Sequence, residues 1–314
     1  MAIDIAQGLG MGGARRGKRA VRLSARDRIT IGVMVGVPLL VVGGLIWFPT
    51  IASVLLSFTN WDGIGGGTTA HWVGTENYRQ IATIYPPFWP AVKHNLIWLG
   101  FLAFVATPFG LLLAYQLDKR IRGSRIYQSI FFMPVVLSFA IIGFIWELIY
   151  SPSQGLLNNI FENPAHGNVT DWLGNPRLNL WAVLVAVCWR HAGYIMILYL
   201  AGLKAIDPSL REAAAIDGAG EWHAFRTVVF PALRPINIVI LVVTVIEALR
   251  AFDIVFIINK GRNGLELLSV LVTDNIIGEA SRIGYGSAIA VILIVISIIP
   301  IVVFVWNSFS EKQA

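Results

Sequence analysis

Charged side chains inside long apolar segments are the first candidates for chemistry in this sequence. Glu247, Arg250 and Asp253 follow one another at intervals of three residues in a segment otherwise rich in Ile, Val, Leu and Ala. Residues three apart share a helix face, so Glu247 and Arg250 could form an internal ion pair. Alternatively Arg250, or Arg190 beside His191 in an earlier apolar segment, could meet a substrate or a partner subunit. The sequence leaves both interpretations open.

Other kinds of site lack the residues they need. The five histidines have no ligand-like spacing, so we predict no metal site. Residues 12–19 (GGARRGKR) nearly match a phosphate-binding loop, but an arginine replaces the Ser or Thr that binds magnesium, and no strand precedes them. The His, Asp and Glu residues form no constellation typical of an enzyme. We therefore expect no catalytic residue and no cofactor bound by this chain, so any energy from ATP must come through another subunit.

The composition indicates that lipid surrounds most of these segments. Hydrophobic residues make up 56% of the 314 and charged residues only 13%, against about 25% charged residues in soluble domains. A membrane-spanning helix needs about 20 mostly apolar residues. The sequence predicts an all-α, polytopic membrane protein with six transmembrane helices, at about 29–58, 96–116, 130–150, 180–203, 236–258 and 285–306.

The distribution of Lys and Arg predicts the orientation. The side that holds the N-terminus carries 16 of these residues in its tails and loops, and the other side carries six. Since basic loops stay inside the cell, we predict that both termini are cytoplasmic. The expected parts are a basic cytoplasmic tail at 1–28, a transmembrane domain at 29–308 and a cytoplasmic tail at 309–314. The basic tail indicates contact with anionic lipid rather than with nucleic acid.

A cytoplasmic segment at about 207–234, between the fourth and fifth spans, has the pattern of a helix followed by a turn. Asp-Pro-Ser at 207–209 is a helix-start signal, three alanines follow Glu212, and Gly218 can end the helix. A second amphipathic stretch begins at Trp222. We predict a compact knob on the cytoplasmic side.

This segment resembles the EAA loop of ABC-importer permeases. That loop has Glu-Ala-Ala, then Gly six residues after the Glu, then a β-branched residue and Pro, which here are Glu212-Ala213-Ala214, Gly218, Val228 and Pro231. Val228 and Phe230 stand where Ile and Leu are usual. The resemblance implies a coupling helix that docks in a cleft of a separate ATPase and moves with it. Its ATPase-coupling residues would be Glu212, Ala213, Ala214, Asp217 and Gly218.

Most of the chain after residue 28 resembles the carbohydrate permeases of this family, of the maltose and glycerol-3-phosphate type. The resemblance lies in residues 57–62 and 73–78 of the first outer loop and in residues 125–134 before the third span. It implies a type I ABC importer permease fold. It also implies sugar contacts at Trp189 and Tyr194 and around 248–251, since an aromatic face can stack on a sugar ring. Arg190 and His191 stand where the maltose permease is uncharged, so the sequence does not name the sugar.

The resemblance further implies the partners. They are a homologous second permease in a heterodimer, two ATPase subunits that bind ATP and Mg, and an extracytoplasmic sugar-binding protein, all at a bacterial plasma membrane. The chain would provide a midplane site with alternating access, for a di- or oligosaccharide. The alternatives are an importer of another solute, such as glycerol-phosphate, an amino acid or another anion, and a proton-coupled transporter that uses Glu247 and Asp253. An integral membrane enzyme ranks last.

Overall fold

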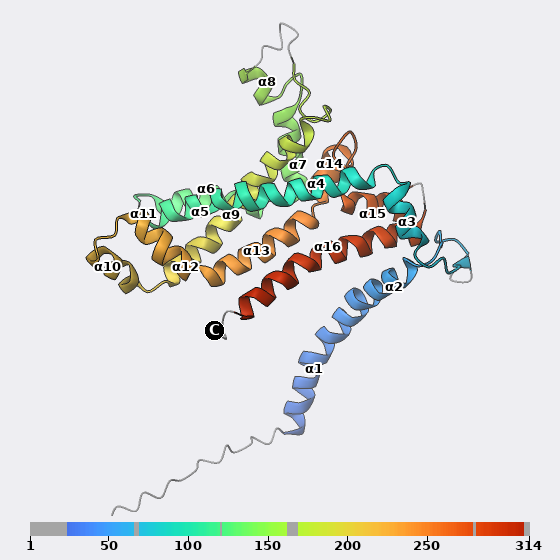
Figure 1. Cartoon of the computed structure of the whole chain (residues 1–314), viewed down its shortest axis with the longest axis horizontal. Coiled ribbons are helices and arrows are strands. Elements are labelled where there is room, and N and C mark those ends of the chain that lie inside the picture. Colours follow the sequence, from blue (N-terminus) through green and yellow to red (C-terminus); the bar gives the residue numbers. More distant parts are fainter. Residues whose placement is uncertain (1–23, 66–68, 120, 162–168, 279–280, 311–314) are drawn as a thin grey trace, which may run out of the picture. The chain divides into compact units, whose positions relative to one another are not determined.

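The structure is a computed structural model that describes residues 24–65, 69–119, 121–161, 169–278 and 281–310, without the side chains of 303–305 and 307–310 (Figure 1). The near match to a phosphate-binding loop at 12–19 and most of the basic tail lie outside these residues. The chain divides into two compact units, Met1–Ile51 and Ala52–Ala314, which are described separately.

A long apolar helix makes up the described part of the first unit and ends five residues into the second. Helix α1 spans Ala25–Val42 and continues through a π-helical turn, η1 at Gly43–Trp47, into α2 at Phe48–Leu56. A capping box starts α1: the Ser24 hydroxyl accepts a hydrogen bond from the Asp27 amide, and the Asp27 carboxylate accepts one from the Ser24 amide. No residue of α1 is buried. The first predicted span is therefore helical.

The second unit is built around α9, Asn179–Ala205, most of whose residues are buried. Helix α4 at Phe88–Phe101, η3 at Leu102–Ala106 and α5 at Thr107–Asp118 form one apolar helix, and α16 spans Ile283–Ser310. These helices correspond to the predicted second, fourth and sixth spans. Among the described residues, four helices have the length and composition to cross a membrane, and the number is five if a bent pair of helices is counted as one span.

The bent pair corrects the third predicted span. Two helices, α6 at Ser124–Val136 and α7 at Phe139–Tyr150, meet at an angle of 102° instead of forming one helix over 130–150. Pro134 cannot donate a backbone hydrogen bond, which weakens the end of α6. The next helix then has its own start, because the Ser138 hydroxyl accepts a hydrogen bond from the Ile141 amide.

The fifth predicted span is also broken. Helix α13 spans only Arg234–Leu249, and a short helix, α14 at Asp253–Asn259, begins after three residues. The backbone leaves helical geometry at Phe252, with φ −143° and ψ −60°. The two helices together cover the predicted stretch, so the chain remains compatible with six spans, but Arg250 lies at a break rather than inside a helix.

Shorter helices lie at the two ends of the second unit. One end carries α3 at Glu76–Thr83 and α15 at Leu268–Ile276 (Figure 1). The other end carries α10 at Pro208–Ile216, α11 at Glu221–Ala224, η5 at Phe225–Val229 and α12 at Phe230–Ala232. Helix α8 is at Leu156–Phe161. The described residues contain one isolated β-bridge, Thr59 with Trp72, and no named strand. The predicted all-α class is confirmed.

Candidate functional site

A polar cavity lies where α9 passes the break between α13 and α14. Its volume is about 210 Å³, and four charged side chains line it together with apolar and aromatic groups. The lining residues are Trp98, Leu102, Phe139, Val187, Arg190, Glu247, Arg250, Ala251, Phe252, Asp253 and Ile254. The structure thus brings together Arg190, Glu247 and Arg250, three of the predicted pathway residues, from elements far apart in the sequence.

Arg190 has the most contacts among the charged groups of this cavity. Its Nη1 lies 3.9 Å from Glu247 Oε2, and its guanidinium carbon lies 4.1 Å from the centre of the Phe139 ring. Its buried Nε has no hydrogen-bond partner among the described residues. An ion pair this long is not a hydrogen bond, so the Nη1 group of Arg190 keeps hydrogen-bonding capacity for a polar ligand in the cavity.

The internal pair between Glu247 and Arg250 is not the one that forms. Glu247 pairs with Arg190 instead, and Arg250 forms no ion pair with any described side chain. The physical reason is the end of α13 at Leu249, since Arg250 follows the helix and the chain then turns away. The spacing argument assumed one continuous helix. Arg250 and Asp253 are both exposed at the cavity.

Neighbouring helices hold the broken backbone in place. The buried side chain of Asn95 accepts a hydrogen bond from the Leu268 amide at 2.9 Å and donates to the Ala248 carbonyl at 3.4 Å. The Ser269 hydroxyl donates to the Ala251 carbonyl. The bonds to Ala248 and Ala251 satisfy carbonyl groups at the break, and the bond from Leu268 satisfies an amide at the start of α15. The sequence analysis missed Asn95, although an Asn within an apolar segment is a signal that could have identified it.

The other three predicted pathway residues lie outside this cavity lining. His191 is buried, and its Nε2 lies 3.3 Å from Thr244 Oγ1, which joins α9 to α13. Trp189 is half-buried and meets the ring of Trp146 edge-on, with ring centres 6.0 Å apart. Tyr194 packs against an apolar cluster that includes Met196. Sugar contacts at Trp189 and Tyr194 stay predictions.

The predicted helix and turn at 207–218 are confirmed. The Asp207 carboxylate caps α10 by accepting a hydrogen bond from the Ser209 amide at 2.9 Å, and this bond lowers the pKa of Asp207. Asp217 follows the last helical residue, and Gly218 adopts a left-handed φ of 78°. Glycine adopts this conformation without the steric cost that a side chain brings.

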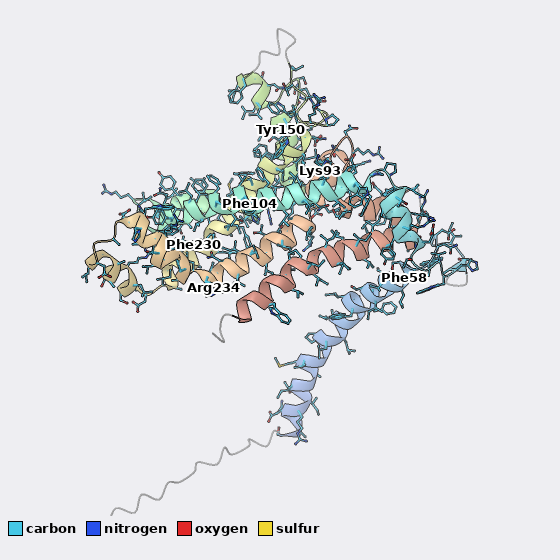
Figure 2. All side chains as sticks on the ribbon, viewed as in Figure 1. Phe58, Lys93, Phe104, Tyr150, Phe230 and Arg234 are labelled. Atoms are coloured by element: carbon cyan, nitrogen blue, oxygen red, sulfur yellow. The ribbon has the colours of Figure 1, made fainter. Side chains whose placement is uncertain are left out.

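The EAA residues divide between an exposed and a buried side of α10. Ala214 is buried, whereas Glu212, Ala213, Asp217 and Gly218 are exposed. We call α10, the following turn and α11 the knob. The knob therefore keeps most of its EAA residues accessible to a partner. Phe230 and Arg234 lie near it, at the other end of the unit from Lys93 on α4 (Figure 2).

Two ion pairs join the knob to the end of α5. Arg211 Nη1 lies 2.7 Å from Asp118 Oδ2, and Lys119 Nζ lies 2.6 Å from Glu221 Oε2. Lys119 also lies over the Tyr115 ring, 4.7 Å from its centre. The hydrogen bond between Lys119 and Glu221 raises the pKa of Lys119 and lowers the pKa of Glu221. Sequence reasoning missed these pairs because their members are 93 and 102 residues apart.

Long apolar helices, a polar cavity beside broken helices and an exposed helix-turn knob together define a polytopic membrane permease. A family model described as "Binding-protein-dependent transport system inner membrane component" matches residues 106–312. The chain belongs to this family, and the predicted ABC-importer permease class is confirmed. It is a multi-pass membrane protein and a transport subunit.

Curated relatives match along most of the chain. The osmoprotective compounds uptake permease protein GgtC of Synechocystis sp. is 31% identical over 88% of this chain and 97% of its own length. The xylose/arabinose import permease protein XacH of Haloferax volcanii is 30% identical over 84% of this chain and 83% of its own. The trehalose/maltose transport system permease protein MalF of Thermococcus litoralis is 32% identical over 71% and 75%.

Two solved structures have the same fold. One is a bacterial ABC transporter involved in the import of the acidic polysaccharide alginate, with a TM-score of 0.76 and 20% identity over 91% of this chain and 96% of that chain. The other is a bacterial alginate ABC transporter in complex with an alginate pentasaccharide-bound periplasmic protein. It has a TM-score of 0.78 and 19% identity over 92% and 96%. The predicted ABC-importer permease fold is confirmed.

Proposed function

We propose that this chain forms one half of the translocation pathway of an ATP-driven carbohydrate importer, and that α10 is its coupling helix. The observation that carries the proposal is the knob itself. It presents Glu212, Ala213, Asp217 and Gly218 outward while ion pairs hold its base against α5. A short, rigid and exposed helix suits a cleft in a partner, because little conformational entropy is lost when it docks.

The substrate class follows from the relatives and from the cavity. Relatives named for xylose and arabinose, and for trehalose and maltose, favour a sugar, and we propose a di- or oligosaccharide. The cavity offers the rings of Trp98, Phe139 and Phe252 beside charged groups. Aromatic faces can pack against the apolar side of a sugar, and charged side chains can hydrogen-bond its hydroxyl groups.

The proposal requires partners that supply what this chain lacks. They are a homologous second permease, two ATPase subunits that bind ATP and Mg, and an extracytoplasmic sugar-binding protein. With the termini in the cytoplasm, the knob faces the ATPases. The titles of the solved relatives support such an assembly, since one names a periplasmic protein that carries the substrate. This chain then opens its cavity to one side of the membrane at a time.

Uptake of labelled sugars tests the proposal. A strain without this chain should lose ATP-dependent uptake of one sugar, and the Gly218→Asp variant should insert in the membrane without restoring it. Normal uptake and stimulated ATPase activity in Gly218→Asp would contradict coupling through α10. Uptake that survives deletion of the cognate ATPases would instead indicate a proton-coupled transporter that uses Glu247 and Asp253.

An anionic solute is the second candidate, because one observation favours it. Arg250 is exposed at the cavity and has no ion pair with a described residue, so it could bind a carboxylate or a phosphate. Competition with glycerol-phosphate, amino acids and neutral sugars in the same uptake assay separates the candidates. Loss of an anion's uptake, with every neutral sugar unaffected, would replace the sugar proposal.

A further inference from the structure

We infer that the pairs Asp118–Arg211 and Lys119–Glu221, together the clamp, make the knob and the end of α5 one mechanical body. Movement of the knob would then reach the cavity through α5 and α9. This inference rests on the proposed function, because it names the residues that transmit the ATPase movement, which the EAA residues receive. The clamp residues are positioning residues and contact no substrate.

The clamp holds the knob at two separate points. Arg211 lies on α10, immediately before the EAA sequence, and Glu221 is the first residue of α11, beyond the Gly218 turn. Their partners, Asp118 and Lys119, are adjacent at the end of α5. Two attachments, one on each side of a turn, resist rotation as well as separation. A single pair would leave the knob free to pivot.

The two pairs are close enough for direct hydrogen bonds and differ in their exposure to water. Both distances are below 2.8 Å, which is typical of charge-assisted hydrogen bonds. The Asp118 side chain is only 13% exposed, so water screens this pair less than it screens the other. All four clamp residues line a cavity of about 250 Å³, together with Tyr115, Ala215 and Phe225. The ion pairs thus lie at this cavity, beside the place where the rings of Tyr115 and Phe225 pack directly, with their centres 4.6 Å apart.

The chain connection to α9 is a weaker link than the clamp. Helix α9 ends at Ala205, the next residue is extended with φ −72° and ψ 135°, and α10 begins at Pro208. Two residues outside any helix can rotate about their backbone angles without breaking a helical hydrogen bond. A push on α10 would therefore bend this connection, so other routes must carry it. They are the helical continuation of the knob from α11 through η5 and α12 to α13, and α5 if the clamp holds.

Helix α5 supplies one such route, because it packs closely on α9. A Cβ atom on Gly110 would lie 2.8 Å from the Ala192 carbonyl oxygen and 2.8 Å from Ile195 Cβ. Such contacts leave no space for α5 to slide without displacing α9. Ala192 lies two residues after Arg190, whose guanidinium faces Glu247 across the cavity. Movement at Asp118 is thus linked to the Arg190–Glu247 pair.

Charge reversal tests the clamp in the complete importer, reconstituted with its partners in proteoliposomes. Asp118→Arg and Arg211→Asp should each lower the substrate transported per ATP hydrolysed by at least about fivefold, the lower end of typical coupling effects. The double variant should recover most of this ratio, since the pair is restored with its charges exchanged. Lys119→Glu and Glu221→Lys, alone and together, repeat the test. Unchanged ratios in the single variants would overturn the inference.

A matched control tests whether reversing any positive charge near the knob lowers the ratio of transport to ATP hydrolysis. Arg226 lies on η5, is exposed, and has no ion pair with a described residue. Arg226→Asp should keep the normal ratio of transport to ATP hydrolysis. A fall equal to that of Arg211→Asp would show a general charge effect on ATPase docking and would overturn the inference.

Cross-linking tests the same idea without relying on folding of the charge variants. Cys188 is the one cysteine of the chain, so Cys188→Ser gives a background for Asp118→Cys with Arg211→Cys. A short thiol-specific cross-linker should restore the coupling that the two substitutions weaken, because α10 and α5 move together. If cross-linking blocks uptake while ATP hydrolysis continues, α10 moves relative to α5 and the inference fails.

Gly218→Asp separates this inference from the proposed function. Normal uptake in Gly218→Asp would contradict the proposed coupling role of α10 itself. Lost uptake in Gly218→Asp, together with normal coupling in all the clamp variants, would agree with the proposed function and contradict only the inference about the clamp.

Discussion

The cavity and the knob use ion pairs in opposite ways. In the cavity, Arg190 and Glu247 are 3.9 Å apart, and the buried Nε of Arg190 has no described partner. In the knob, the two pairs are 2.7 and 2.6 Å long. A loose pair with spare hydrogen-bonding capacity can exchange its partner for a ligand, whereas a short pair holds two elements together. The cavity is therefore suited to rearrangement, and the knob to transmission of movement.

Among the variants that test this comparison, removing the charge of Glu247 should cause the largest loss of activity. Glu247→Gln keeps the shape of the side chain but leaves the partly buried Arg190 without a counter-ion. We expect sugar uptake to fall by about tenfold or more, since Arg190, whose side chain is 20% exposed, would lose the one acidic partner it has among the described residues. Labelled uptake in membrane vesicles measures this change.

The control for that variant is Glu76→Gln, which changes a carboxylate of the same 37% exposure on α3, far along the chain from the cavity. It should leave uptake unchanged. Equal loss of uptake in both variants would mean that Glu247 has no special place in the pathway, and the contrast between cavity and knob would lose its basis.

Gly110→Ala should weaken the packing on which transmission depends. The added methyl group meets the Ala192 carbonyl oxygen and Ile195 at 2.8 Å, so α5 and α9 must separate. Overpacking of this kind costs about 1–3 kcal/mol of stability. Denaturant unfolding in detergent micelles measures the loss. Gly100→Ala is the matched control, because nothing lies within 4 Å of its Cβ, and it should not destabilise the protein.

Gly218→Ala should have a smaller effect, confined to the knob. The space around Gly218 is open, but its φ of 78° is unfavourable for alanine. The expected cost is about 1 kcal/mol, with a modest loss of coupling. Thermal unfolding and transport per ATP hydrolysed measure the two effects. Gly220→Ala is the control, since its φ is −64° and its surroundings are also open. Equal effects at both positions would contradict a conformational role for Gly218.

The exposed pair of Glu76 and Arg79 should give the smallest effect and a reference for the other two regions. Arg79, 2.7 Å away, lowers the pKa of Glu76 from 4.5 to about 2. Because the folded pKa is depressed, this pair stabilises α3 fully above pH 4.5 and loses its contribution as the pH falls to about 2. Arg79→Ala should therefore lower the thermal stability slightly above pH 4.5, by the small amount typical of a surface pair, and this difference should disappear as the pH falls to about 2. Thermal unfolding of both proteins between pH 2 and 7 measures it, and a difference that grows toward pH 2 would contradict it.

Local signals in the sequence were sufficient for the knob. Asp207, Pro208, the alanines and Gly218 determine a helix with a start and a stop within a dozen residues, and the structure has both. The apolar segments likewise predicted the long helices α4–α5, α9 and α16. Predictions failed where a span is broken, at 130–150 and at 236–258, because apolar composition does not reveal where a helix ends.

Patterns within the sequence were enough to predict a membrane-spanning, all-helical chain with an EAA segment. Each of these properties depends on residues close together in the chain, through hydrophobicity, helix capping or the conformational freedom of glycine. The pairing of Glu247 with Arg190 rather than Arg250, and of Asp118 and Lys119 with the knob, depends instead on the packing of distant helices. Those pairs join residues that are 57 to 102 positions apart, and their distances depend on how the helices break and pack, which no local pattern specifies.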